Sequence, residues 1–267
     1  MDYLWIPSVV LVGTANVAQS VAFIAKHERS THINYFVIDN AAPQKVSDKI
    51  KFIGREQIAE AVRGVDVVFM LTALNDAATC KAARFIADCV KNENGWLSVG
   101  ITQSASNEFA NELNYLEQKL KVVINLEEQQ NNQPVEDFSY KIVHGIHSVY
   151  DEKFYPYVRP IDGADLVYFL TYGRKTFVSF GEASGENANV AAVNAAMDSP
   201  FIKKRLQEAR SVFLNTMGAT DYLSLFEESE ASTIVYEAAN PDGEIYPAVN
   251  LDEALGEKIF VIIFIRV

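Results

Sequence analysis

The stretch that most constrains the fold of this chain is residues 66–89, where a buried strand leads directly into a helix. Residues 67–71 form an unbroken apolar run rich in β-branched side chains, which predicts a strand buried on both faces of a sheet. From Thr79 onward the apolar residues recur at helical spacing. A strand that leads into a helix is the usual place for a phosphate to bind, because free N–H groups of the first helical turn point at it.

The turn between this strand and helix lacks the glycine that phosphate binding normally needs. Residues 73–78 read Ala-Leu-Asn-Asp-Ala-Ala, so each carries a Cβ that keeps the backbone away from a phosphate. Asn75 or Asp76 is expected to cap the helix, and its side-chain oxygen would take the donors that a phosphate needs. The Asp76 carboxylate would also repel a triphosphate. The sequence therefore predicts a nucleotide-type architecture whose site is filled by side chains.

Composition and charge narrow the class of protein further. The chain has 267 residues, enough for one large or two smaller domains. Its net charge of −12 disfavours nucleic acid and anionic membranes as partners, because both need basic patches. No apolar run approaches the roughly 18–20 residues of a membrane span. We therefore expect a cytoplasmic protein that does not bind membranes directly.

The two cysteines predict neither a disulfide nor a metal site. Cys80 and Cys89 lie nine residues apart on one predicted helix, which is too far for a disulfide. Both are expected to be reduced, as is usual in the cytoplasm. The four histidines show no ligand spacing that would join them to these cysteines, so no metal is expected.

Strands and helices alternate through the first half of the chain. This alternation predicts a parallel, doubly wound α/β sheet. Residues 41–52 are expected to form a loop, since Pro43 bars a helix there. The predicted strands are residues 8–12, 33–38, 67–71, 96–101 and 122–126.

The second half predicts a separate, smaller domain. A helix at residues 136–150 and an extended, proline-marked linker at 155–161 mark the junction. The apolar run at 258–266 is expected to be a central strand of the second sheet. The turn at Gly256 is short enough to join antiparallel strands. The other predicted elements are helices at 162–170, 187–197 and 223–238 and strands at 176–180, 211–215 and 244–249.

Residues 13–18, Gly-Thr-Ala-Asn-Val-Ala, follow the first strand and are a degenerate form of the dinucleotide-binding fingerprint. Asp39 lies roughly where a ribose-binding acid belongs. The pattern leaves an NAD site open. The alternative is that any tight strand-to-helix turn begins with glycine and continues with small residues. No His and Arg pair in a dehydrogenase-like context supports hydride transfer.

Five short motifs in the second half occur in the order found in one known family. They are Gly181, Gly-Glu-Asn at 185–187, Ser-Pro at 199–200, Asn-Pro-Asp at 240–242 and Asp-Glu-Ala-Leu-Gly at 252–256. With the alanine-rich segment between them, they resemble the C-terminal domain of FtsZ, the bacterial homologue of tubulin. The resemblance covers residues 163–267 closely and extends loosely into the first half.

The resemblance implies the tubulin/FtsZ-like fold: a Rossmann-like parallel-sheet domain joined by a connecting helix to a smaller α+β C-terminal domain. The implied ranges are 1–134 for the nucleotide-binding-like domain, 135–161 for the connecting helix and linker, and 162–267 for the C-terminal domain.

FtsZ holds the phosphates of GTP with glycine clusters after its first and central strands, and this chain departs from that pattern at both places. The departures imply a pseudo-GTPase that binds no cofactor. The alternative is that it still binds GTP or GDP. The vestigial site would comprise Gly13, Thr14, Ala15, Asn16, Asn75, Asp76 and, near where guanine would stack on the connecting helix, Phe138.

Residues 160–165 resemble the FtsZ loop whose acids reach into the neighbouring subunit and position the water that attacks its GTP. Asp162 and Asp165 match the two acids, whereas Pro160 replaces the family's asparagine. The resemblance implies that both aspartates could act catalytically in trans. The alternative is that they stabilise the start of a helix.

Taken together, the resemblance implies a cytoskeletal or cell-division protein with GTPase activity lost. It would associate with itself or regulate filaments of a conventional FtsZ-type partner. Because the chain ends at Val267, directly after the last predicted strand, this association is expected to use the globular body. A divergent GTP-binding polymerase and an NAD-binding Rossmann protein remain as alternatives.

Overall fold

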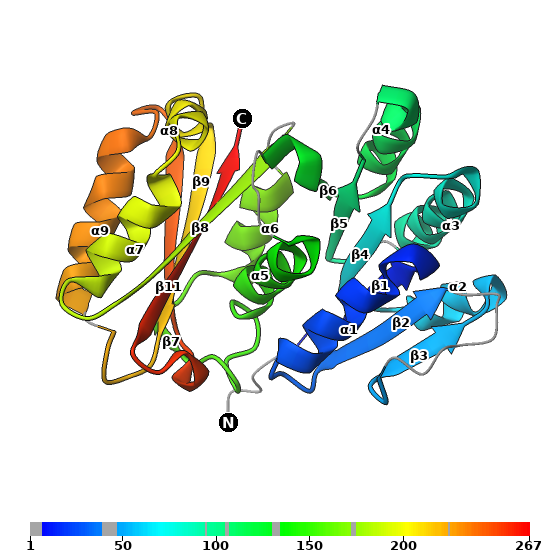
Figure 1. The fold of residues 1–267 in the computed structure, drawn as a ribbon, viewed down its shortest axis with the longest axis horizontal. Helices are drawn as coiled ribbons and strands as arrows, with labels where there is room; N and C mark the ends of the chain where they lie inside the picture. The colour runs from blue at the N-terminus through cyan, green and yellow to red at the C-terminus, as the bar shows by residue number, and fades with distance from the viewer. Residues whose placement is uncertain are drawn as a thin grey trace. The chain divides into compact units, whose positions relative to one another are not determined.

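A computed structural model describes residues 7–38, 47–93, 95–104, 107–129, 134–171, 175–223 and 225–267. The chain divides into two compact units, residues 1–144 and 145–267. The division falls inside helix α5 (Val135–His147), which appears in green in Figure 1. Within the described residues, no helix is long and apolar enough to cross a membrane.

The first unit contains a parallel sheet, as the sequence predicts, with six strands instead of the predicted five. Its strand order is β3-β2-β1-β4-β5-β6, so the order reverses between β1 and β4. In open α/β sheets, ligands bind in the crevice outside the carboxyl ends of the strands at this switch point. The strands are β1 (Val9–Thr14), β2 (Ile33–Ile38), β3 (Ile50–Ile53), β4 (Val67–Ala73), β5 (Leu97–Gln103) and β6 (Val122–Asn125).

Helices cover this sheet in the doubly wound manner (Figure 1). The face formed by Val10, Val12, Val68 and Met70 packs against α2, α3 and α4 in one buried cluster. Helix α1 packs on the other face of the sheet, beside Gly13 of β1. Successive residues of a strand point to opposite faces, so Gly13 and Val12 face different helices. The helical elements are η1 (Ala15–Val17), α1 (Ala18–His27), η2 (Arg55–Gln57), α2 (Ile58–Ala61), α3 (Ala77–Glu93), η3 (Asn107–Phe109), α4 (Ala110–Lys119) and η4 (Leu126–Gln129).

The loop predicted for residues 41–52 is wrong at its end. Ile50–Ile53 forms β3, an edge strand that pairs in parallel with β2. A four-residue edge strand with an exposed lysine in it carries too short an apolar pattern to be distinguished from a loop. Asp39, the predicted ribose-binding acid, lies outside the described residues.

The second unit contains a five-stranded mixed sheet in the order β7-β10-β9-β11-β8. Only β9 and β10 run parallel; the other pairs are antiparallel. The last strand, β11, pairs on both sides, which confirms its predicted central position. The strands are β7 (Tyr157–Arg159), β8 (Thr176–Ser184), β9 (Ser211–Gly218), β10 (Glu244–Leu251) and β11 (Lys258–Arg266).

The turn at Gly256 does not join two paired strands. Strand β9 lies between β10 and β11, so the connection that contains η5 (Glu253–Leu255) crosses over a strand instead of closing a hairpin. Turn length indicates only that the two strands can run in opposite directions. Which strand fills the place between them depends on the whole topology.

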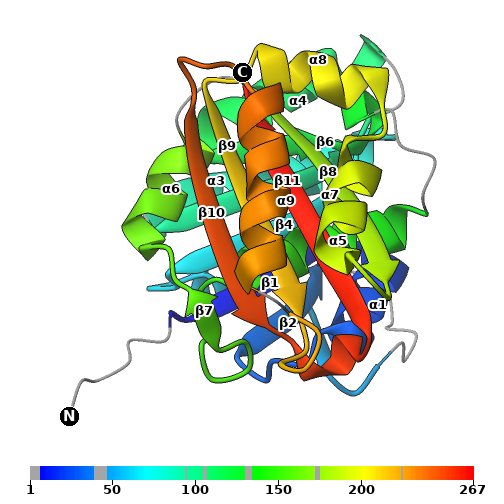
Figure 2. The same ribbon diagram turned by 90° about the vertical axis from the view of Figure 1, so that its left-hand side faces the viewer.

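Two helices pack side by side across one face of the second sheet (Figure 2). They are α7 (Ala188–Met197) and α9 (Leu225–Ala238), which share a buried cluster with alternate residues of β9 and β11. Helix α6 (Gly163–Thr171) packs on the opposite face, where Phe169 contacts the ring of Phe213 at 5.7 Å between centroids. Helix α8 (Pro200–Gln207) was not predicted, because three consecutive basic residues obscure its apolar periodicity.

Two buried asparagines join this opposite face to the segment after the unit boundary. The Asn215 amide donates to the Gly145 carbonyl at 3.1 Å and to the Ser148 hydroxyl at 3.0 Å. The Asn250 amide donates to the Ser148 carbonyl at 3.2 Å. These bonds satisfy carbonyls that the end of a helix would otherwise leave buried without donors.

Candidate functional site

The switch point of the first sheet brings together the loops after β1 and β4. The Asn16 amide donates to the Ala73 carbonyl at 2.8 Å and to Asn75 Oδ1 at 3.0 Å. The Thr14 hydroxyl lies 2.7 Å from Asn16 Oδ1 and 3.1 Å from the Thr72 hydroxyl. Hydrogen bonds therefore bridge the crevice where a nucleotide would enter such a fold.

The start of α3 is capped by a carboxylate of the chain itself. Asp76 Oδ1 accepts the N–H groups of Ala78 and Thr79, both at 2.8 Å, and Oδ2 accepts the Thr79 hydroxyl at 2.8 Å. The backbone hydrogen bond from Thr79, followed by the bond from its hydroxyl, holds the pKa of Asp76 below its ordinary value. The residue is therefore a charged cap. Of the two predicted candidates, Asp76 and not Asn75 takes the donors at this helix start.

Gly13 has a packing role that explains its presence without a ligand. A Cβ at this position would lie 2.5 Å from Val21 Cγ2 and 3.3 Å from Val17 Cγ2. The glycine thus lets α1 pack close against β1. Ala15, the third residue of the predicted fingerprint, is exposed at the start of η1.

Little free volume remains beneath these loops. A cavity of about 10 Å³ lies between α1, the ends of β4 and β5, and the start of α5. This volume is at the lower limit of what a single water molecule requires, about 10–15 Å³. Its walls include Val17, Leu71, Ile101 and Ser139. The interior behind the switch point is packed with side chains.

Phe138, predicted near the guanine position, is only 3 % exposed. Its place in α5 lies one turn into the helix, where its N–H donates to the carbonyl of Pro134 at 3.0 Å. A base could stack on this ring only by displacing the residues that bury it. The structure thus places Phe138 in the interior.

The roomier depression next to the start of α3 is acidic. It has a volume of about 390 Å³ and is bordered by Asp76, Glu108 and Glu112. Glu112 is paired with Arg84 at 2.5 Å and 2.9 Å. The described residues contain no group of three or more His, Cys, Asp or Glu side chains that could hold a metal ion. Three carboxylates on one border are a poor match for phosphate.

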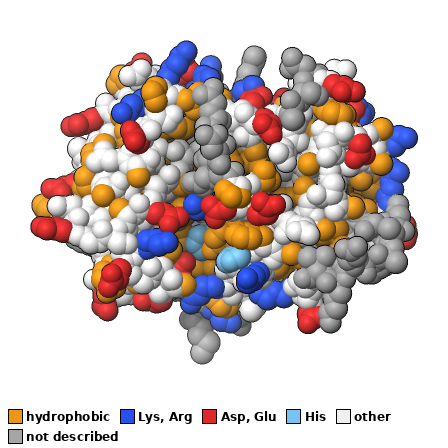
Figure 3. All heavy atoms as spheres, viewed as in Figure 1, with side chains coloured by type: hydrophobic (Ala, Val, Ile, Leu, Met, Phe, Trp, Pro, Cys, Tyr) orange, Lys and Arg blue, Asp and Glu red, His pale blue; other side chains and the backbone are white. Residues whose placement is uncertain are grey.

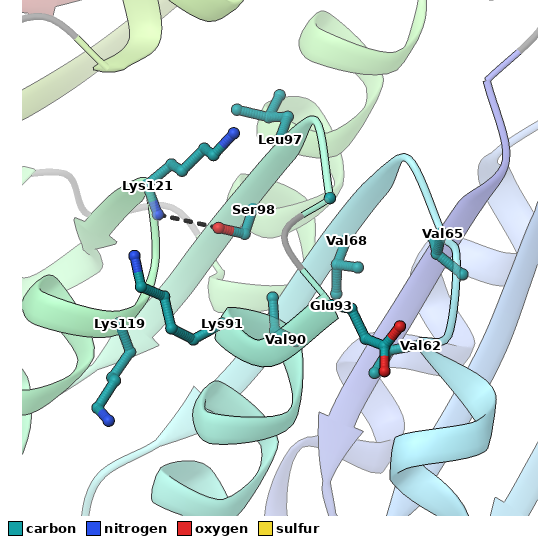
Figure 4. Close-up of a pocket in the computed structure, with 11 residues that line it drawn as sticks. Val62, Val65, Val68, Val90, Lys91, Glu93, Leu97, Ser98, Lys119 and Lys121 are labelled. Atoms are coloured by element: carbon teal, nitrogen blue, oxygen red, sulfur yellow. Dashed lines mark hydrogen bonds between the residues drawn. The ribbon is translucent and has the colours of Figure 1, made fainter.

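A smaller cavity, about 30 Å³, lies at the other end of the strands, beside the first residues of β4 and β5 (Figure 4). Valines 62, 65, 68 and 90 line it, and Lys91, Lys119 and Lys121 surround it. Burial, with a smaller contribution from Lys91, lowers the pKa of Lys121. Lys91 and Lys119 belong to the last turns of α3 and α4, where cations offset the helix dipole. These lysines therefore have a structural explanation, and no motif in the sequence had singled them out.

Asp162 and Asp165 lie in the second unit, at the start of α6. Asp162 Oδ1 accepts the N–H of Ala164 at 2.8 Å, and its carbonyl accepts the N–H of Leu166 at 3.0 Å. Both aspartates are exposed. The Asp162 side chain therefore caps the N-terminus of α6, and Asp165 is an acidic residue in the first turn of this helix.

Replacing Asp162 with alanine is expected to lower the free energy of unfolding by about 1 kcal/mol, because the cap is lost. Asp162→Asn should cost only a few tenths of that figure, since asparagine caps about as well as aspartate. Urea denaturation of the full chain followed by circular dichroism measures both. Equal losses for the two variants would contradict the capping role.

Comparisons with known proteins agree with this description. Residues 175–266 match the family described as FtsZ family, C-terminal domain. An FtsZ point mutant from M. jannaschii superposes with a TM-score of 0.79 at 20 % identity, covering 98 % of this chain and 91 % of that one. An empty FtsZ dimer from M. jannaschii gives 0.77 at 18 %, covering 97 % and 88 %. CetZ from Methanosaeta thermophila strain DSM 6194 gives 0.69 at 11 %, covering 97 % and 86 %.

The strand order, the helix at the unit boundary and these superpositions define the class: a two-domain α/β protein with the FtsZ/tubulin fold. At such low identities the solved structures establish the fold, and the match over residues 175–266 adds the family of the second unit. The chain as a whole therefore has the FtsZ/tubulin fold, and residues 175–266 match the FtsZ C-terminal domain family.

Proposed function

We propose that this chain is a pseudo-GTPase with a cytoskeletal or cell-division role. It associates with itself or regulates filaments of a conventional FtsZ-type partner, and it does not hydrolyse GTP. The FtsZ/tubulin fold supports the cytoskeletal part of the proposal. The FtsZ dimer among the similar structures supports self-association.

One observation supports the proposed loss of nucleotide binding: a carboxylate of the chain takes the N–H groups that a phosphate would need. Asp76 uses the N–H groups at the start of α3, and Asn16 joins the two loops that would have to part. An incoming phosphate would break these hydrogen bonds and approach a carboxylate whose pKa is already lowered. Both effects oppose binding.

A divergent GTP-binding polymerase is the second candidate, and one observation favours it. The start of η1, unlike that of α3, has no side-chain cap, because Thr14 makes no capping hydrogen bond. The N–H groups of residues 15–17 could then receive an anion. The third candidate, an NAD-binding protein, relies on the same turn.

Isothermal titration of the full chain with GTP, GDP and NAD in the presence of Mg²⁺ separates the three candidates. We expect no binding with a Kd below about 1 mM for any of them, which corresponds to a binding free energy of about −4 kcal/mol. A micromolar Kd for GTP would refute the pseudo-GTPase proposal, and NAD binding would support the fingerprint. A matched Asp76→Asn variant keeps a capping side chain but removes its charge, so it separates repulsion from occupation of the donors.

Electron microscopy and sedimentation of the chain, alone and with a conventional FtsZ, test the assembly role. We expect filaments, shortened partner filaments or a subunit complex. Asp162→Asn and Asp165→Asn together would lower the partner's GTP turnover in the mixture if these acids act in trans. Absence of any assembly or complex would refute the interaction role while leaving the titration result unaffected.

A further inference from the structure

Helix α9 presents side chains to the core and to solvent along two opposite stripes. Ala231 and Val235 are buried in the core of the second unit. On the outer side, Phe226, Ser229, Thr233 and Tyr236 are all exposed. Their spacing of three, four and three residues places them in a single stripe along the helix. We refer to these four residues as the outer stripe.

The outer stripe exposes more aromatic surface than any other described part of the chain. Phe226 is 74 % exposed and Tyr236 46 %. Tyr222, in the turn four residues before Phe226, is also 46 % exposed, and Tyr168 is the remaining large hydrophobic residue of comparable exposure among the described residues. Grouped exposed aromatics mark interaction surfaces, because burying them is favourable.

The charged side chains of α9 and its flanking segments are all acidic. Residues 211–257 contain ten Asp and Glu residues and no Lys, Arg or His, in a chain with 23 Lys and Arg in total. Glu230 and Glu237 lie one turn after Phe226 and Thr233, and both are exposed. They form no ion pair with other described residues. Buried Glu228, by contrast, is already engaged by Ser232 and by Arg159 at 3.7 Å. Figure 3 shows acidic and hydrophobic side chains along the margin formed by α9.

From these features we infer that the outer stripe of α9 docks a basic amphipathic helix of another protein. Ser229 and Thr233 are small, so a crossing helix can approach α9 most closely between the rings of Phe226 and Tyr236. We call this position the saddle. Ten residues of helix span about 15 Å, or nearly three turns, enough for apolar side chains of a crossing helix to enter the saddle. Lysines or arginines of that helix meet Glu230 and Glu237 and stack over the aromatic rings.

Charge selects such a partner over a second copy of the chain. Two copies joined stripe to stripe would bring the exposed Glu230 and Glu237 of both copies together, whereas a basic segment meets these acids with the opposite charge. The inference concerns the second unit and does not depend on whether the switch point binds a nucleotide.

Fluorescence anisotropy of the full chain with a labelled 14-residue Lys/Leu amphipathic peptide tests this inference. A peptide with glutamate in place of each lysine is the charge control. We expect binding of the Lys/Leu peptide alone, weakened by salt. Phe226→Ser should weaken binding about tenfold or more, in the range of hot-spot truncations. Glu230→Gln with Glu237→Gln should weaken it about three- to tenfold.

Tyr168→Ser and Glu60→Gln, which remove an exposed aromatic and an exposed acid elsewhere, should change the Kd by less than about twofold. Thr233→Arg places a positive charge in the saddle, which repels the positively charged Lys/Leu peptide and should abolish its binding. Circular dichroism verifies that each variant is folded. Unchanged binding by Phe226→Ser and Thr233→Arg would overturn the inference. So would a dimer, seen by analytical ultracentrifugation, that Phe226→Ser dissociates, because the occupant would then be a second copy.

Discussion

Replacing Gly181 with valine is expected to lower the free energy of unfolding by more than about 4 kcal/mol, at the upper end of single substitutions. Gly181 lies in β8, where the backbone of α7 comes into direct contact with the strand. A Cβ there would overlap the carbonyl oxygen of Ala192, and it would lie 2.5 Å from the backbone nitrogen of Ala196. Because these are backbone atoms, no side chain can rotate away. The helix itself has to move.

The loss of stability is large because α7 covers the buried cluster of the second unit. Ala192, Val193 and Ala196 belong to the buried cluster of the second unit, together with Val261 and Ile263 of β11. Moving α7 outward opens gaps throughout this cluster, and each gap forfeits packing that the surroundings recover only partly. Gly181→Ala should cost nearly as much as Gly181→Val, because the first added carbon already causes the overlap.

Urea denaturation of the full chain, followed by far-ultraviolet circular dichroism, measures this effect. Gly185→Asn is the matched control. The backbone φ of Gly185 is +91°, a conformation that residues with a side chain rarely adopt, but a Cβ at this position meets nothing within 4 Å. It should therefore cost only about 1–3 kcal/mol of backbone strain. A Gly181→Val midpoint equal to that of the unmodified chain would contradict the direct contact between α7 and β8.

The first sheet could be predicted because its strands are long apolar runs separated by amphipathic helices. Val67–Ala73 is buried over nearly its whole length, so its pattern does not depend on neighbours. Ile50–Ile53 could not be predicted, because an edge strand of four residues is half exposed. The crossing of β9 between β10 and β11 was also missed, since strand order is a property of the assembled sheet and not of any local segment.

The candidate site divides in the same way between local and long-range features. The Asp76 cap was predictable, because its partners Ala78 and Thr79 are two and three residues away. The bridge from Asn16 to Ala73 and Asn75 joins residues 57 and 59 positions apart. It exists only because β1 and β4 are neighbours at the switch point. The outer stripe of α9 could not be predicted, because Phe226 and Tyr236 lie ten residues apart in a segment dominated by glutamates.

Replacing Glu28 with alanine is expected to lower the free energy of unfolding by about 3–5 kcal/mol, the usual cost of removing one partner of a buried contact between ionisable groups. Glu28 follows α1, and its Oε2 lies 3.1 Å from Nδ1 of His144 in α5, with side chains 0 % and 4 % exposed. Its Oε1 accepts the N–H of Ser30 at 3.1 Å. The carboxylate thus joins the end of α1 to α5 within the first unit.

Four further variants separate the pair from its surroundings in urea denaturation. Glu208→Ala, which removes an exposed partner of Lys204 and Arg205, should cost less than about 1 kcal/mol. Glu28→Gln keeps an acceptor for Ser30 without the charge and should cost less than Glu28→Ala. His144→Ala, alone and combined with Glu28→Ala, completes a double-mutant cycle.

The cycle distinguishes two physical accounts of this pair. If the contact between Glu28 and His144 stabilises the first unit, the double variant loses much less than the sum of the single losses, since the second deletion removes a group that already lacks its partner. Simple additivity would instead show that each side chain is held by other neighbours, such as Tyr140, whose ring stacks on His144 at 5.3 Å between centroids. The expected coupling, about 1–3 kcal/mol, would make this pair a main attachment of α5 to the first unit.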